Sequence, residues 1–138
     1  CFIMMQSLQP DVLIAKSQHK SLKRMVADAF RRRDRVAPFL SAEVRRAALC
    51  DDAALPDDVV ALHREVSFQL DRSPPTPYRI LVFPAGFNDP ETQINILSPL
   101  GAALLGLRRG DRMRVFLPEE GFHTLRVIGV RRKANARR

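Results

Sequence analysis

The chain has 138 residues, of which 46% are hydrophobic and 28% are charged, and its mean hydropathy is -0.16. This length and balance predict one globular domain, or a domain with a small appendage, and exclude a disordered chain. No apolar run approaches the roughly 20 residues that a membrane-spanning helix needs. We therefore expect a soluble protein that has no membrane partner.

The two cysteines, Cys1 and Cys50, are too few for a disulfide framework. This favours a reducing compartment, and we expect a cytoplasmic location. The first five residues are too short and too uncharged for a secretory signal peptide, and Met4 or Met5 is the expected natural start.

The formal net charge of +8 is unevenly distributed along the chain. Residues 16–46 carry +7, residues 47–107 carry -5, and residues 108–138 carry +7. Two basic ends around an acidic middle favour a nucleic acid or a large acidic protein as partner, although many solvated faces share this pattern.

The first basic segment is predicted to be helical. Apolar residues recur at spacings of three and four over residues 17–33, and Ser17 is the expected N-cap of this helix. A turn at residues 33–37 leads to a second helix, which begins near Pro38 and ends near Leu49. Because the connection is short, the two helices are expected to pack as an antiparallel hairpin.

In the second half of the chain the apolar period changes to two, as in strands. Residues 65–70 alternate polar and apolar side chains, and residues 79–83 form a second apolar run. A short strand is expected at residues 94–97. Two further strands, at residues 113–117 and 124–130, are joined by turn residues.

The clearest local signal is a short helix between these strands. Ser98 can cap it, Pro99 fits its first position, and Gly106 suits the left-handed residue beyond its end. Residues 100–105 are mostly apolar, so this helix should be buried against the sheet. The expected fold class is α+β: a short N-terminal antiparallel helical hairpin followed by a sheet with one short helix.

The sequence contains no catalytic or metal-binding constellation. The three histidines are far apart, and neither cysteine lies at the paired spacing of a zinc site. Gly101, Gly106 and Gly110 could form a phosphate cradle, but helix packing, a helix end and a turn explain them more simply. We expect no enzymatic activity, no metal, no cofactor and no small-molecule substrate.

Residues 94–111 carry the most specific motif. The stretch Ile94–Leu107, followed by Gly110 and Asp111, resembles the C-terminal domain signature of the Gre-type (GreA/GreB) transcription elongation factors. Among them it most resembles the Rnk-type regulators of nucleoside diphosphate kinase. Further stretches that resemble this family are residues 55–60 and 81–85.

The resemblance spans roughly residues 40–130 and implies both a fold and a partner. The implied fold is a helical hairpin, a short coiled coil over residues 1–52, on an FKBP-like antiparallel domain over residues 53–138. The implied partner is bacterial RNA polymerase. In Gre-type factors the C-terminal domain docks at the rim of the secondary channel and the hairpin enters it, where acidic tip residues help to hold a catalytic magnesium ion.

The expected hairpin tip departs from the family pattern. It consists of Arg31, Arg32, Arg33, Asp34 and Arg35, with one carboxylate among four guanidinium groups. Such a site is poor for Mg²⁺, which prefers several oxygen ligands. An arm of about 16 residues also reaches only ~24 Å, less than the long coiled coil of the cleavage factors. We therefore do not expect this chain to have the cleavage activity of Gre-type factors. The basic run is equally consistent with a phosphate-binding site and with a solvated helix end.

These observations predict a non-enzymatic transcription regulator that binds RNA polymerase and competes with Gre-type factors. An alternative is a basic nucleic-acid-binding module, for example one that binds DNA, supported by Arg131–Lys133 and Arg137–Arg138. A weak nucleic-acid contact is also expected beside the first function. A prolyl isomerase, by analogy with the FKBP-like fold, is disfavoured by the few aromatic residues. The expected polymerase-docking residues are Ser98, Pro99, Arg108, Arg109, Gly110, Asp111 and Arg112.

Overall fold

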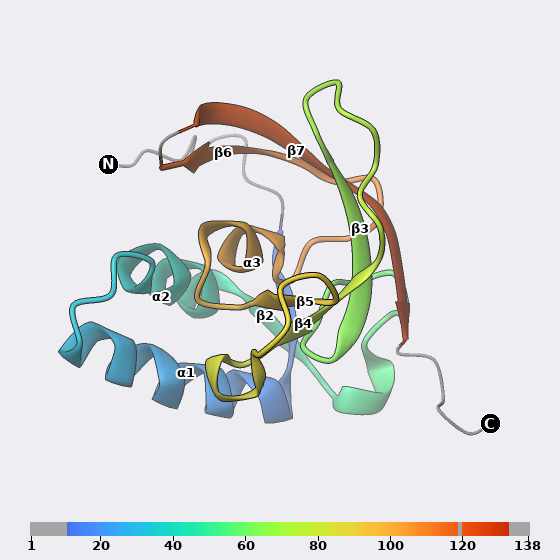
Figure 1. Ribbon diagram of the computed structural model, residues 1–138. Coiled ribbons are helices and arrows are strands. Elements are labelled where there is room, and N and C mark those ends of the chain that lie inside the picture. The colour runs from blue at the N-terminus through green and yellow to red at the C-terminus, as the bar shows by residue number, and fades with distance from the viewer. Residues whose placement is uncertain (1–10, 119, 133–138) are drawn as a thin grey trace.

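The computed structural model describes residues 11–118 and 120–132. Within this part of the chain, three α-helices and a curled five-stranded sheet form a mixed α+β fold, with a small second sheet beside them (Figure 1). The expectation of a mixed α+β fold is therefore confirmed. None of the helices that the structure describes has both the length and the apolar character needed to cross a membrane.

The first two helices lie side by side and belong to the main hydrophobic core (Figure 1). Helix α1 (Lys16–Arg31) buries Leu22 and Val26, and helix α2 (Ala37–Arg46) buries Leu40. These side chains pack in the same cluster as residues of the main sheet. That the two helices form a separate unit up to residue 52 stays a prediction.

Two helix boundaries differ from the sequence-based predictions. Ser17 is not the N-cap of α1, because the helix begins one residue earlier, at Lys16, and Ala15 is its boundary residue. The Ser17 N–H donates to Asp52 Oδ1 at 3.2 Å. Helix α2 ends at Arg46 and not near Leu49, because the backbone becomes extended from Ala47 onward.

The residues just before α1 and just after α2 form a small sheet that the sequence did not predict. Strand β1 (Leu13–Ala15) pairs in parallel with strand β2 (Ala48–Cys50), so that Ile14 lies beside Leu49. Each strand has three residues, too few for an apolar period to be recognised. This pairing brings the start of α1 close to the end of α2.

The main sheet has the spatial order β5-β4-β3-β7-β6. The predicted strands are all present, with boundaries shifted by at most a few residues. The strand bounds are β3 (Arg64–Leu70), β4 (Arg79–Val82), β5 (Gln93–Asn95), β6 (Arg112–Leu117) and β7 (Gly121–Arg132).

The expectation of a fully antiparallel sheet is wrong. Strands β3, β4, β6 and β7 form antiparallel pairs, but β5 runs parallel to β4. The connection at residues 83–92 explains this difference. It crosses back through a 3-10 turn at Pro84–Gly86 and a turn in which the Thr92 N–H donates to the carbonyl of Asp89, so β5 starts at the same end as β4.

The short helix α3 (Pro99–Leu104) lies in the concave side of the curled sheet (Figure 1). Leu104 is fully buried in the main core. The chain leaving α3 is held in place because the Gly106 N–H donates to the carbonyl of Val60 at 2.9 Å, and the Val60 N–H donates to the carbonyl of Leu107 at 2.8 Å. The predicted burial of this helix is confirmed.

Candidate functional site

The start of α3 is tied to the end of β5 by a compact hydrogen-bond network. The Ser98 hydroxyl accepts the Gly101 N–H at 3.0 Å and donates to the carbonyl of Asn95 at 2.7 Å. A Cβ atom at Gly101 would lie 2.2 Å from that same carbonyl oxygen. The predicted roles of Ser98 as N-cap and of Pro99 in the first turn are confirmed, and the glycine is required because the helix passes against the backbone of β5.

The end of α3 also has the predicted conformation. Gly106 has a φ of +82°, the left-handed conformation that glycine adopts without steric cost. A Cβ atom there would lie 2.2 Å from Cγ1 of Val12. Gly106 is therefore explained by helix termination and close packing, and not by a phosphate cradle.

The turn Arg108–Asp111 is anchored through its backbone. The Asp111 carboxylate accepts the Arg108 N–H at 2.8 Å, and Gly110, with a φ of +90°, donates its N–H to the carbonyl of Val127 at 2.8 Å. The Arg109 N–H donates to the carbonyl of Asp58 at 2.9 Å. The Arg108 and Arg109 side chains project into solvent from this rigid turn, and no described carboxylate forms an ion pair with either guanidinium.

The expected docking residues fall into two groups rather than one. Arg108–Arg112 are contiguous in the turn and the first residue of β6, and their side chains are exposed except that of Asp111, which is half-buried. Ser98 and Pro99 are half-buried at the opposite end of α3. The six-residue helix, about 9 Å long, and residues 105–107 lie between the two groups.

The connection between α1 and α2 is a tight helix-ending turn. The Asp34 N–H donates to the carbonyl of Ala29 and the Arg33 N–H to that of Phe30, both at 3.0 Å, which is the pattern of a Schellman motif. Arg33 occupies the left-handed position of this motif, with a φ of +59°. Glycine is the usual residue at this position, so the arginine adopts it at a steric cost.

The carboxylates at this turn are engaged in local structure. Asp34 Oδ1 accepts the N–H of Val36 at 2.9 Å, at the entrance to α2. The carboxylate of Asp28 pairs with the guanidinium groups of Arg31 and Arg32, at 3.1 and 3.2 Å. Across the residues that the structure describes, no three His, Cys, Asp or Glu side chains are grouped so that they could hold a metal ion.

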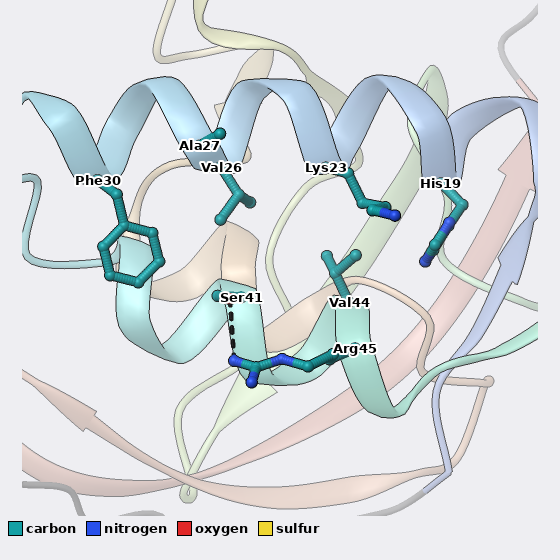
Figure 2. A pocket seen from close by; sticks show the side chains of 8 residues that line it. All are labelled: His19, Lys23, Val26, Ala27, Phe30, Ser41, Val44 and Arg45. Carbon is teal, nitrogen blue, oxygen red and sulfur yellow. Dashed lines mark hydrogen bonds between the residues drawn. The ribbon is translucent and has the colours of Figure 1, made fainter.

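An open groove of about 520 Å³ lies between α1 and α2 (Figure 2). Val26 and Val44 provide apolar walls, while Lys23 from α1 and Arg45 from α2 extend beside it. The Arg45 guanidinium donates to the Ser41 hydroxyl at 3.2 Å. The described lining residues include the imidazole of His19 and the hydroxyl of Ser41, which accepts from Arg45, but no carboxylate or thiol.

The basic C-terminal end is partly neutralised. Arg131 pairs with Glu65 at 2.7 Å, and its guanidinium carbon lies 3.8 Å from the centre of the Tyr78 ring. Arg132 pairs with Asp57 at 3.0 Å. The remaining basic residues of this end, Lys133, Arg137 and Arg138, lie outside the described residues.

Two exposed aromatic side chains were missed by the sequence analysis. Phe116 and Phe122 are 46% and 48% exposed and lie side by side on the β6–β7 hairpin. The signal for them was present as the alternation Arg-x-Arg-x-Phe at residues 112–116 and Phe-x-Thr-x-Arg at residues 122–126. Because β6 and β7 pair in antiparallel register, the two patterns face one another.

Comparison with known proteins confirms the resemblance carried by residues 94–111. The chain is 41% identical over 83 residues to the regulators of nucleoside diphosphate kinase from Escherichia coli (strain K12) and Shigella flexneri. These matches cover 60% of this chain and about 61% of the length of these curated relatives.

A solved structure has a similar fold. The prokaryotic transcription elongation factor GreA/GreB from Nitrosomonas europaea superimposes with a TM-score of 0.68 at 26% identity, covering 89% of this chain and 99% of that one. The family model for the C-terminal domain of the transcription elongation factors GreA/GreB matches residues 55–132, which is more than half of the chain. The chain therefore belongs to the GreA/GreB C-terminal domain family.

Proposed function

We propose that this protein is a transcription regulator that binds bacterial RNA polymerase at the entrance of the secondary channel. It would not stimulate transcript cleavage itself and would compete with Gre-type factors for the same site. Its relatives are named for regulation of nucleoside diphosphate kinase, and polymerase binding is the route that we propose for regulation of this kind.

The observation that carries the proposal is the form of the family motif. In this chain the motif folds into a hydrogen-bonded support, in which the side chains of Ser98 and Asp111 accept backbone N–H groups and further backbone hydrogen bonds hold the Arg108–Asp111 turn. The Arg108 and Arg109 side chains are exposed on that support. Charged groups exposed on a protein surface accelerate association with a partner of opposite charge and favour that partner over others. We therefore propose this turn, together with Arg112, Ser98 and Pro99, as the polymerase-docking surface.

The α1–α2 turn supports competition rather than cleavage. The only carboxylate among residues 31–35, that of Asp34, already accepts a backbone hydrogen bond, and the nearby Asp28 is paired with Arg31 and Arg32. The arginines give the turn a net positive charge. A site for Mg²⁺ normally provides carboxylates with oxygen atoms directed at the ion. Helix α1, with 16 residues, is about 24 Å long, so the turn would reach only a short distance into a channel.

The test is binding of the full chain to purified core RNA polymerase at low salt. Arg109→Glu should weaken binding by about tenfold, because reversal of a charge at a docking surface creates repulsion. Arg72→Glu is a matched control, because Arg72 is also an exposed loop arginine. Absence of binding at micromolar concentration, or equal loss for the two variants, would refute the proposal.

The C-terminal end does not favour a separate nucleic-acid-binding function. Arg131 and Arg132, on which that alternative partly rested, are paired with Glu65 and Asp57. Surface pairs of this kind contribute little to stability, but they reduce the charge available to phosphates. The exposed face of the β6–β7 hairpin is better suited to contact with a nucleic acid.

A further inference from the structure

The exposed face of the β6–β7 hairpin combines arginine and phenylalanine side chains in ordered pairs. The inner face of β6 is formed by Met113, Val115 and Leu117, which are buried in the main core. Alternate residues therefore point away from the core. The cross-strand pairs on this exposed face are Arg112 with Arg126, Arg114 with Thr124, and Phe116 with Phe122.

The aromatic end of this face presents two rings to solvent. The centres of the Phe116 and Phe122 rings are 5.1 Å apart, with an angle of 63° between the ring planes. Arg114 places its guanidinium carbon 5.1 Å from the centre of the Phe122 ring. Each phenylalanine is nearly half exposed, and because the ring planes are inclined to one another, each ring offers its own stacking surface beside a positive charge.

The basic end of the face carries uncompensated charge. Arg112 and Arg126 lie directly opposite one another, an arrangement in which like charges destabilise a sheet. The next residue across the sheet from Arg126 is the neutral Gln69. An anion bound between the two guanidinium groups would relieve this repulsion.

The nearby carboxylates are already engaged elsewhere. Asp71 accepts the backbone N–H of Thr124 at 2.8 Å and is hydrogen-bonded to His123, while Asp111 accepts the N–H of Arg108. None of the described ion pairs involves Arg112, Arg114 or Arg126. The Asp71 carboxylate keeps its charge and interacts electrostatically with Arg114 without forming an ion pair, so the positive charge of the face comes from its own three arginines.

We propose that this face binds single-stranded RNA. Bases would stack on Phe116 and Phe122, and phosphates would contact Arg112, Arg114 and Arg126. Aromatic platforms beside basic side chains are the usual means of binding unpaired bases. At ~3.4 Å per residue the face extends about 14 Å from its first to its last pair, the length of about four stacked nucleotides.

The choice of a single strand, over a duplex or an acidic protein, follows from the two kinds of contact together, and the oligo(dT) arm of the test separates RNA from DNA. A paired duplex presents its phosphates but hides its base faces, so it would leave the two rings exposed. An acidic protein segment would match the charge but brings no flat ring at each step. Unpaired RNA brings one phosphate and one base with each nucleotide. This inference goes beyond polymerase binding, because it concerns RNA in the absence of polymerase.

The test measures fluorescence anisotropy of a labelled 12-nucleotide oligo(U) titrated with the full chain at low and at moderate salt. Phe116→Leu with Phe122→Leu keeps an apolar surface but removes the rings, and should weaken binding by at least fivefold. Arg114→Gln with Arg126→Gln should weaken it by about tenfold or more and flatten its salt dependence. Lys20→Gln with Lys23→Gln removes the same charge from α1 and should change binding by less than about threefold.

All six substituted residues are exposed, so each variant should melt close to wild type, and melting curves verify this. Equal loss in the α1 control and the arginine variant would overturn the proposal, because it would reduce binding to net charge. No loss in the phenylalanine variant would also overturn it. Tighter binding of oligo(dT) or of duplex RNA would overturn the assignment to single-stranded RNA. The two proposed surfaces share Arg112, but none of the six substituted residues is in the proposed polymerase-docking set, so failure of this test leaves that proposal standing.

Discussion

The carboxylate of Glu43 accepts two hydrogen bonds from the guanidinium of Arg46, at 3.0 and 3.2 Å. The two residues lie one turn apart on α2, and Glu43 is only 2% exposed. A buried carboxylate is costly unless charged donors compensate it. The pair therefore makes the last turn of α2 sensitive to the loss of either residue.

We expect Arg46→Ala to lower the free energy of unfolding by about 2–4 kcal/mol, because it removes compensation from a buried charge. The Arg46 side chain is 31% exposed, so water can replace part of the interaction. Urea denaturation measures the change. Adding Glu43→Gln should restore part of the loss, and a destabilisation below about 0.5 kcal/mol for Arg46→Ala would contradict the expectation.

Gly101→Ala should destabilise the protein by about 2 kcal/mol or more. The new methyl group would lie 2.2 Å from the carbonyl oxygen of Asn95, so α3 or β5 must shift. Gly86→Ala is the matched control, because no atom lies within 4 Å of a Cβ there. The control should remain within about 0.5 kcal/mol of wild type by urea denaturation. Equal stability of the two variants would show that the close approach is not a constraint.

Arg33→Gly should stabilise the protein by about 1 kcal/mol. The φ of +59° at this position costs a residue with a side chain more than it costs glycine. Arg33→Ala removes the same charge but keeps the Cβ atom, so it should not produce the gain. If the two variants had the same melting temperature, the effect would come from charge and not from the backbone.

The stability of the protein should depend on Asp71 at acid pH. Its pKa is lowered from the ordinary value of 3.8, first by the backbone hydrogen bond from Thr124 and then by the hydrogen bond from His123. A carboxyl with a depressed folded-state pKa contributes stability above its unfolded pKa and loses it as the pH falls through the folded value. Urea denaturation between about pH 5 and pH 2 should therefore show a smaller loss for Asp71→Asn than for wild type. Parallel curves would exclude this role.

The predictable parts of the fold are those whose signals are local. Ser98, Pro99 and Gly106 carry the capping chemistry of α3 within nine residues, and all three have the predicted roles. The small sheet could not be predicted, because Ile14 finds its partner Leu49 from a distant part of the chain. The N-cap assigned to Ser17 failed for the same reason, since a distant residue, Asp52, accepts its N–H.

The candidate sites follow the same rule. The Arg108–Asp111 turn was predictable because glycine and aspartate define it locally. The Phe116–Phe122 pair required the register of β6 against β7, which depends on the whole hairpin and on the sheet that carries it. Composition placed positive charge at the end of the chain, but the cross-strand pairing of Arg112 with Arg126 became visible only in the structure.

The α1–α2 turn should support no transcript cleavage by this protein. Added to a backtracked transcription complex, the chain should release no short RNA, because its one tip carboxylate is committed to the Val36 N–H and lies among arginines. If it docks as proposed, it should also reduce the cleavage stimulated by a Gre factor in proportion to its concentration. Gel analysis of labelled transcripts measures both effects.

Asp34→Asn provides the decisive variant for this prediction. Asparagine keeps a side-chain oxygen that can accept the Val36 N–H and so preserves the turn, while it removes the charge that a metal ion would need. Asp34→Ala, in contrast, also removes the hydrogen bond and should cost about 1 kcal/mol of stability. Asp34→Asn should compete with the Gre factor as well as wild type does, because in this account the carboxylate binds no metal. Strong cleavage by wild type that disappears in Asp34→Asn would show that a single carboxylate suffices and that the arginines do not exclude the ion.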